Sequence, residues 1–220
     1  MILVRRVTGR WYWRPRALAF ARMELIVIRH GRPERIEGAA GGADPDLTDI
    51  GDRQALAMAN WMAEEQLDAI YVSPMARARQ TSRPLENIAG MEATVDDRVR
   101  EFDHKHANYI PMEELRQDKE AWRRYVSAEA SSTRSDFADT VMGGINEIVD
   151  RHRSERVAVV CHGGVVNIVA ARVLGIADRM FFNPDYTSIN RFMFASSGEQ
   201  SVLSLNDTGH LRPTPELLLS

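Results

Sequence analysis

The chain has 220 residues, of which 44% are hydrophobic and 27% charged, so it is long enough to bury a core without disulfide or metal staples. Its net charge of −3 argues against a strongly basic nucleic-acid binder and against an acidic disordered chain. The single cysteine, Cys161, excludes an intrachain disulfide and favours a reducing, cytoplasmic setting. No apolar run approaches the roughly 18 residues of a membrane span, so a membrane is not an expected partner. The net charge makes nucleic acid an unexpected partner as well.

Residues 1–22 differ in composition from the rest of the chain. They hold six arginines and no acidic residue, and arginine interrupts every apolar run that a signal peptide would need. We interpret them as a basic N-terminal extension, poorly ordered and without function. A basic tail that touches anionic lipid or nucleic acid is the alternative. The folded domain is then expected to span residues 23–220.

The first elements after this extension are a strand, a long loop and a helix. Leu25–Ile28 is a short apolar run typical of a buried strand. Residues 32–46 are rich in glycine, proline and charge, which predicts a loop. Thr48 is expected to cap the helix, with Asp49 and Asp52 near its positive end.

A second strand and helix follow, and then a more polar stretch. Ala69–Val72 is predicted as a strand, with Ser73 as a cap and Pro74 at the first position of the next helix. Glu92–Val95 resembles a weaker strand. Residues 97–135 are interpreted as a helical excursion over the edge of the sheet.

The last third of the chain repeats the alternation. Apolar spacing from Phe137 to Ile148 predicts a helix, and Val157–Cys161 is the clearest strand of the sequence. The helix after that strand is expected to end at Gly175. Arg191–Ala195 and Ser201–Leu205 resemble two closing strands. Strand–helix alternation predicts an α/β sandwich with a largely parallel sheet.

Polar side chains gather where predicted strands end. Because sites in open α/β sheets form beyond the carboxyl ends of strands, the segments Arg29–Gly31, Ser73–Thr81 and Cys161–Gly164 are expected to converge. Arg98–Asp103 lies between the last two and adds a carboxylate. Two histidines, at least two arginines and one acid would then share one site.

This set of groups suits a phosphomonoester. Arginine forks neutralise phosphoryl oxygens, and a neutral imidazole can attack phosphorus and carry the group covalently. A nearby carboxylic acid can protonate the leaving oxygen and later take a proton from water. Clustered cations should lower the pKa of the attacking histidine and keep it unprotonated.

Five fragments of the sequence occur in the order seen in one known family. The chain resembles the histidine phosphatase superfamily, also called the phosphoglycerate mutase-like family. The matching fragments are Ile28–Gly31, Asp46–Ala55, Ser73–Thr81, Val160–Gly164 and Asn206–Leu211. The resemblance implies a three-layer α/β/α sandwich with a mixed, mainly parallel central sheet.

The resemblance also assigns roles. It implies that His30 is the nucleophile that becomes phosphohistidine and that Glu101 is the general acid and base. Arg29, Arg77 and His162 would surround the phosphoryl group, with His162 counted among the catalytic residues. No metal and no cofactor are implied, so the activity expected is that of a metal-independent phosphomonoester hydrolase.

Several neighbouring residues receive weaker assignments. Arg79 lies two positions from Arg77, so the two point to nearly opposite sides of a helix and only one can face the site. Arg32 and Tyr109 are possible substrate contacts. Asp103 is the substitute acid should Glu101 point away from the pocket.

Two other functions remain open on the sequence. One is a phosphoglycerate mutase-type phosphotransferase, which Ile36 and Gly164 disfavour because such mutases carry asparagine at both places. The other is a non-catalytic phosphate-binding protein on the same fold. The expected partner is a small phosphorylated substrate rather than a phosphoprotein. Neither the identity of that substrate nor the oligomeric state follows from the sequence.

Overall fold

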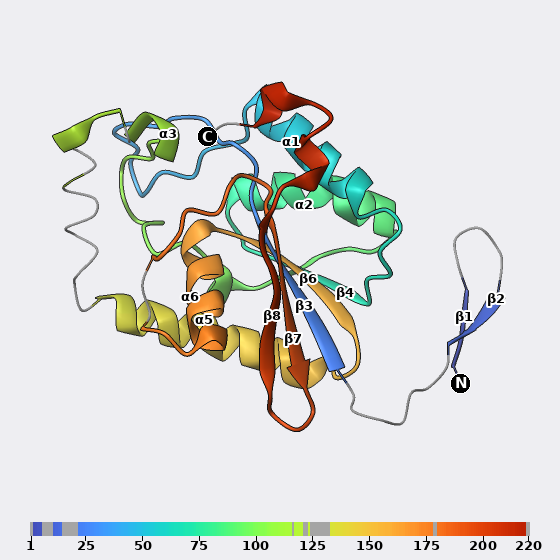
Figure 1. Ribbon diagram of the computed structural model, residues 1–220. Helices are drawn as coiled ribbons and strands as arrows, with labels where there is room; N and C mark the ends of the chain where they lie inside the picture. Colours follow the sequence, from blue (N-terminus) through green and yellow to red (C-terminus); the bar gives the residue numbers. More distant parts are fainter. Residues whose placement is uncertain are drawn as a thin grey trace.

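The structure, a computed structural model, describes residues 2–5, 11–14, 22–115, 117–120, 123, 133–177 and 180–218. Its centre is a six-stranded sheet whose strands run in the order β5-β4-β6-β3-β7-β8 (Figure 1). The strands are β3 (Arg22–Arg29), β4 (Ala69–Val72), β5 (Thr94–Val95), β6 (Arg156–Cys161), β7 (Ile189–Ala195) and β8 (Gln200–Asp207).

The sheet is mixed but mainly parallel. Strand β3 pairs in parallel with β6, and β4 pairs in parallel with both β6 and β5. Strand β7 runs antiparallel to both of its neighbours, β3 and β8. The predicted fold class is therefore confirmed.

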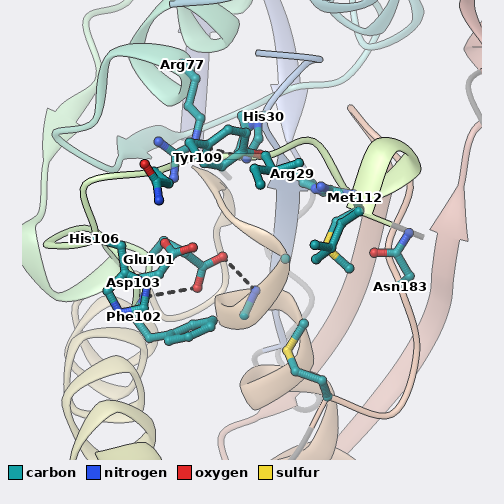
Figure 2. A pocket seen from close by; sticks show the side chains of 16 residues that line it. Arg29, His30, Arg77, Glu101, Phe102, Asp103, His106, Tyr109, Met112 and Asn183 are labelled. Carbon is teal, nitrogen blue, oxygen red and sulfur yellow. Dashed lines mark hydrogen bonds between the residues drawn. The ribbon is translucent and has the colours of Figure 1, made fainter. Parts of the chain in front are cut away.

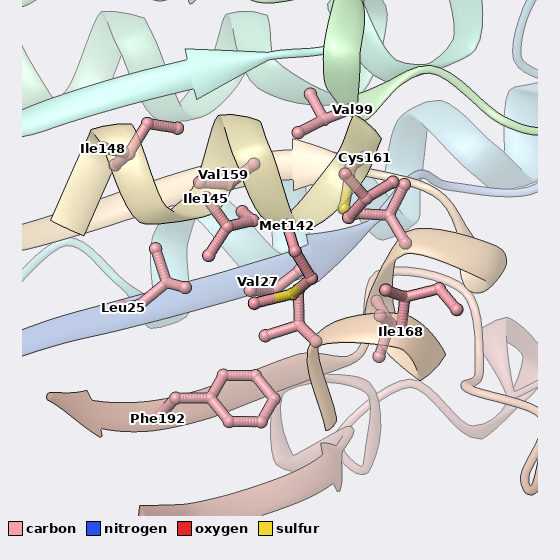
Figure 3. Packing of buried hydrophobic residues seen from close by; sticks show 14 of the residues in the cluster. Leu25, Val27, Val99, Met142, Ile145, Ile148, Val159, Cys161, Ile168 and Phe192 are labelled. Carbon is pink, nitrogen blue, oxygen red and sulfur yellow. The ribbon is translucent and has the colours of Figure 1, made fainter. Parts of the chain in front are cut away.

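Helices cover both faces of the sheet and build two hydrophobic cores. The helices are α1 (Asp49–Trp61), α2 (Ala76–Ala89), α3 (Met112–Leu115), α5 (Thr133–Arg151) and α6 (Gly163–Leu174). Because alternate residues of a strand point to opposite faces, Ile26 and Ile28 pack toward α1 and α2. Leu25 and Val27 pack toward α5 and α6 (Figure 3).

The ends of the helices explain one confirmed prediction and one that is wrong. Thr48 caps α1 as expected, and its Oγ1 accepts a hydrogen bond from the Gly51 amide at 3.0 Å. Helix α2, by contrast, begins at Ala76 and not at Pro74. The Ser73 hydroxyl is bonded to His162 at 2.7 Å, and the Asp44 carboxylate accepts from the Ala76 amide instead.

The predicted extension and excursion are described in part. Ile2–Arg5 (β1) and Trp11–Arg14 (β2) pair as a separate antiparallel sheet, while residues 6–10 and 15–21 lie outside the described residues. The interpretation of residues 1–22 therefore stays a prediction. Within residues 97–135, the described part holds the short 3-10 helix Asp97–Val99, α3 and the first residues of α5. No helix among the described residues is long and apolar enough to cross a membrane.

Candidate active site

The sheet order brings three polar strand ends together. Strands β4, β6 and β3 are adjacent, so the residues that follow them, Ser73, His162 and His30, meet at one edge. The ring centroids of His30 and His162 lie 5.2 Å apart. The convergence expected from the sequence is thus a direct result of strand order.

His30 is held as a neutral ring whose Nε2 carries a lone pair. Its Nδ1 lies 2.7 Å from the Gly31 carbonyl oxygen, which can only accept, so Nδ1 carries the proton. Its Nε2 accepts from Arg77 Nε at 3.2 Å (Figure 2). Burial, followed by the charges of Arg77 and Arg29, lowers the pKa of His30 well below its usual value.

The turn after His30 requires glycine. A Cβ on Gly31 would lie 2.6 Å from the carbonyl oxygen of Gly51, closer than any real side chain approaches. The Gly31 amide donates to Thr81 Oγ1 at 2.9 Å, and this hydroxyl donates to the Arg77 carbonyl at 2.7 Å. Helix α2 therefore holds the histidine turn and the arginine in one fixed arrangement.

Two buried arginines supply the positive charge of the site. The Arg29 guanidinium stacks 4.2 Å from the centre of the Tyr186 ring, and that of Arg77 lies 4.8 Å from the centre of the Tyr109 ring. Arg29 Nε and the NH1 nitrogen of Arg77 have no hydrogen-bond partner among the described residues, although both are buried. Such donors are costly unless an anion completes their bonds.

His162 presents another donor without a partner. Its Nε2 lies 2.7 Å from the Ser73 hydroxyl, whose oxygen also accepts from the Met75 amide at 3.4 Å. Among the described residues the Ser73 proton has no acceptor other than Nε2, so we assign the proton of His162 to Nδ1. Within the described part of the chain, this Nδ1 is buried and makes no hydrogen bond. Burial, with Arg77 next, lowers the pKa of His162 well below normal.

Glu101 follows the 3-10 helix Asp97–Val99, and its side chain contacts the amino end of α6 at the same site. Its two carboxylate oxygens accept from the Gly164 amide at 3.0 Å and from the Phe102 amide at 3.1 Å (Figure 2). A Cβ on Gly164 would lie 2.2 Å from Glu101 Oε1, so the carboxylate occupies the space of the missing side chain. Burial, together with the nearby Asp103, raises the pKa of Glu101 to about 7.

A cavity of about 230 Å³ connects these groups. Of the predicted site residues, Arg29, His30, Arg77, Glu101 and Tyr109 line it, as does Asp103. His162 is fully buried behind His30 and is not part of the lining. The remaining lining residues are Phe102, His106, Asn108, Ile110, Met112, Leu115, Gly163, Gly164, Met180 and Asn183.

Arg32 lies outside the cavity lining. Its Nε donates to Glu113 Oε1 of α3 at 2.9 Å, and its NH2 nitrogen lies 3.6 Å from Glu114 Oε1. The predicted contact between Arg32 and substrate therefore stays without a geometric basis in this structure. Tyr109 reaches the cavity because its backbone pairs with Ile36, by bonds of 2.8 and 3.0 Å.

Sequence reasoning missed two residues that support the site. Ser73 was expected in a segment that converges on the site, but its side chain was assigned only a capping role and not the hydrogen bond to His162. Tyr186 packs against both Arg29 and His30, with its ring centroid 6.0 Å from that of His30. It lies in a loop that carries no motif, so no local signal marks it. No cluster of three or more potential metal ligands occurs among the described residues.

Comparison with known proteins places this site in a family. Residues 25–208 match the family model described as Histidine phosphatase superfamily (branch 1). The chain belongs to this superfamily. Within it, the chain is a phosphatase, in keeping with the several relatives that carry that name.

Two relatives and one solved structure illustrate the match to histidine phosphatases. Phosphoserine phosphatase 1 of Hydrogenobacter thermophilus is 28% identical over 203 residues, which cover 86% of this chain and 94% of that protein. The metal-independent phosphoserine phosphatase of Arabidopsis thaliana is 25% identical over 68% of each chain. The structure of a mycobacterial glucosyl-3-phosphoglycerate phosphatase has a TM-score of 0.69 at 20% identity, covering 85% of this chain and all of that one.

Proposed function

We propose that the chain hydrolyses small phosphomonoesters through a phosphohistidine on His30, without a metal ion. The observation that carries this proposal is the unprotonated Nε2 of a neutral His30, which accepts a hydrogen bond from Arg77 and shares one cavity with two buried arginines and the Glu101 carboxyl group. The names of the relatives support a small phosphorylated substrate, and one of them is a metal-independent enzyme. The reducing setting favoured by the lone buried Cys161 supports a cytoplasmic location.

The phosphoryl group is bound by the donors that lack partners. Arg29 Nε and the NH1 nitrogen of Arg77, which lies 3.6 Å from Asp44 Oδ1, belong to lining residues and are available for its oxygens. A contact between His162 Nδ1 and the phosphoryl group stays a prediction, because His162 lies beside His30 and outside the lining. Arg77 Nε donates a hydrogen bond to the His30 Nε2 lone pair in the structure. When a phosphorus atom approaches this lone pair, the Arg77 N–H donates to a phosphoryl oxygen instead. Substrate binding therefore frees the nucleophile and neutralises the phosphoryl charge together.

Attack and release then proceed in two steps. The His30 Nε2 lone pair forms a bond to phosphorus as the ester P–O bond breaks, and Glu101 gives its proton to the leaving alcohol. In the second step, water attacks phosphorus, its proton returns to Glu101, and the His30–phosphorus bond breaks to release inorganic phosphate. A Glu101 pKa of about 7 suits both directions of proton transfer near neutral pH.

The test is turnover of an aryl phosphate in excess chelator by the wild type and by His30→Ala. We expect metal-free turnover that falls by at least about a thousandfold in the variant, because the covalent route is lost. Brief incubation with labelled substrate should give acid-labile, base-stable phosphate on the wild type only. His152→Gln is the matched histidine control and should keep its activity, because His152 bonds to Tyr71 and Glu155 and does not line the cavity.

Other outcomes would contradict the proposal. Absence of turnover on a broad panel of phosphomonoesters would exclude hydrolysis, and phosphate exchange between phosphoglycerates would favour a mutase. Glu101→Gln should slow alkyl esters more than aryl esters, because a poor leaving group needs the proton most. Equal slowing of both would count against Glu101 as the acid.

A further inference from the structure

The wall of the cavity beyond the phosphoryl-binding groups is largely apolar. Met112 and Leu115 of α3, Met180 and Ile110 line it, and Phe102 adds an aromatic face. Asn108 and Asn183 are the uncharged polar side chains in the same wall. Figure 2 shows Met112 and Asn183 on the side of the cavity opposite Glu101 and Asp103. Phe102 lies beside Asp103 in Figure 2, so we call the other four apolar residues, Met112, Leu115, Met180 and Ile110, the apolar wall.

The charges in the lining are already engaged. Among the described lining residues, the arginines are Arg29 and Arg77, and both lie beside His30, where the phosphoryl group binds. The remaining basic group of the described lining is His106. Burial raises the pKa of Asp103, and the charges of Arg77 and then of His106 oppose this rise, so His106 acts on the carboxyl group beside it. A second anion on the substrate would find carboxyl groups on one side and the apolar wall on the other.

The helix that carries Met112 and Leu115 is also bonded to Arg32, a cation outside the described lining. Glu113 of α3 accepts from Arg32 Nε at 2.9 Å and from the Tyr186 hydroxyl at 3.0 Å. These bonds fix the short helix that carries Met112 and Leu115. They also neutralise the Arg32 charge, so the side chain is bound to protein rather than to substrate.

We propose that the alcohol portion of the substrate is uncharged and mainly apolar, as in alkyl or aryl monophosphates. This inference rests on the proposed phosphomonoester hydrolysis and names its substrate class. Carboxylate-bearing monoesters, such as phosphoserine and 3-phosphoglycerate, are then poor substrates, because their carboxylate loses hydration and the described lining offers it no cation beyond those at the phosphoryl group and beside Asp103. The chain differs in this from relatives named for phosphoserine.

The decisive comparison changes one charge and nothing else. The value of kcat/KM is measured for 3-phosphoglycerate and for its methyl ester, in which the carboxyl is neutral. We expect at least about a tenfold preference for the ester, since one unpaired buried charge costs more than this. Across ethyl, butyl and hexyl phosphate, kcat/KM should rise about threefold per added methylene until the alkyl chain is longer than the apolar wall can contact.

Variants of the apolar wall test the cause. Met112→Arg places a cation in the wall and should reduce or reverse the preference for the ester, while Met112→Leu keeps the wall apolar and should leave the preference intact. Thermal unfolding checks that both variants fold. An equal or greater kcat/KM for free 3-phosphoglycerate in the wild type would overturn the proposal.

Binding separates this inference from the proposed chemistry. Calorimetry with non-hydrolysable phosphonates measures affinity even where no ester is turned over. Tighter binding of hexylphosphonate than of a carboxylate-bearing phosphonate of equal length supports the apolar site, and the reverse order overturns it. Lack of turnover alone would contradict only the hydrolytic function.

Discussion

Glu101 and Asp103 are two carboxyl groups in one buried site with different surroundings. Glu101 accepts two backbone hydrogen bonds, which favour its charged form, yet burial and the nearby Asp103 outweigh them. The result is a raised pKa of about 7, so the group is partly protonated at neutral pH. A carboxyl group in that condition can act as both acid and base within one catalytic cycle.

Asp103→Asn should move the pH profile of the reaction. Removing the negative neighbour lowers the pKa of Glu101, so protonated enzyme is lost earlier as pH rises. The alkaline limb of kcat/KM for an alkyl phosphate should shift to lower pH by roughly half a unit to one unit. The measurement is a profile from about pH 5 to about pH 9, a range that brackets the limb on both sides.

Glu101→Gln provides the control for this shift. It should abolish the limb, because the amide has no proton to lose. A limb at unchanged pH in Asp103→Asn would mean that the two carboxyl groups are not coupled. Loss of the limb in Asp103→Asn itself would make Asp103 the acid.

At this scale the sequence identified the residues beside strand ends and little beyond them. His30, Arg77 and Glu101 lie in short motifs whose position follows from local order along the chain. Tyr186 packs against Arg29 and His30 from a loop, and Met112 lines the cavity from a four-residue helix; both placements depend on long-range packing. Periodicity along the chain contains no information about such contacts.

The C-terminal segment supports the catalytic histidine from a distance. Thr187 has a left-handed backbone, with φ of 55°, and its amide donates to the His30 carbonyl at 3.2 Å. Its hydroxyl donates to the Tyr186 carbonyl at 2.7 Å, so it accepts from His210 Nε2 at 2.9 Å. Burial lowers the pKa of His210 to about 4, although Asp207 opposes the change.

His210→Gln should therefore alter the pH dependence of stability. The wild-type contribution is complete above the unfolded pKa of 6.5 and is lost as pH falls toward 4, because only the unfolded state takes up the proton. A glutamine retains a donor for Thr187 and cannot titrate. The free energy of unfolding should fall less steeply in the variant, by about 2 kcal/mol over this interval.

Urea unfolding at several pH values provides this measurement. His210→Ala, which also removes the hydrogen bond to Thr187, should be less stable than His210→Gln at every pH. Parallel pH curves for the wild type and His210→Gln would mean that His210 keeps an ordinary pKa in the folded protein.

The order of elements was more predictable than their ends. Apolar runs and helical spacing predict β3, β4, β6 and the helices between them, because the pattern of apolar residues in each element follows which of its side chains are buried. The start of α2 at Ala76 was not predictable, since it depends on Ser73 bonding to a histidine distant in sequence. A cap residue recognised from local sequence does not show that a distant side chain will bond to the same hydroxyl.

At the scale of the molecule, a closed ring of charges ties the sheet together at the end away from the cavity. Arg156 contacts Glu24 at 2.6 Å and Glu65 at 3.0 Å. Arg191 contacts the same two carboxylates at 2.8 and 2.6 Å. The ring joins β3, β6 and β7 to the turn after α1. Although burial opposes it, hydrogen bonds from Arg191 and Arg156 lower the pKa of Glu24.

Glu24→Gln should lower the free energy of unfolding by about 1–2 kcal/mol at neutral pH, because two partly buried arginines lose a charged partner. Since the folded pKa of Glu24 lies below 4.5, its contribution is present above that pH and lost as pH falls through the folded value. The difference between wild type and variant should therefore shrink in acid. Chemical denaturation at neutral and acid pH measures it.

Asp150→Asn is the matched control for the ring. Asp150 pairs with Arg153 at 2.9 Å, but both side chains are largely exposed, so its loss should change stability very little. Neither substitution should alter kcat, since both lie far from the cavity. Equal destabilisation by the two substitutions would contradict a special role for the ring.

The overall architecture follows from the sequence because strands and helices alternate along most of the chain, and this alternation predicts a largely parallel sheet. The cavity wall does not follow from the sequence, because much of it comes from residues 102–115 and 180–183, where apolar and polar residues follow no regular spacing. Substrate preference is therefore the property that sequence patterns predict least and that geometry informs most.

The missing side chain of Gly164 links two positions that are 63 residues apart in the sequence. Any larger residue there would displace the Glu101 carboxylate, whose Oε1 lies 2.2 Å from where a Cβ would stand. A side chain at 164 therefore requires the end of the flexible Glu101 side chain to shift, and that shift would also break its hydrogen bond with the Gly164 amide. The position of the acid in this site thus depends on the absence of a side chain from a distant helix.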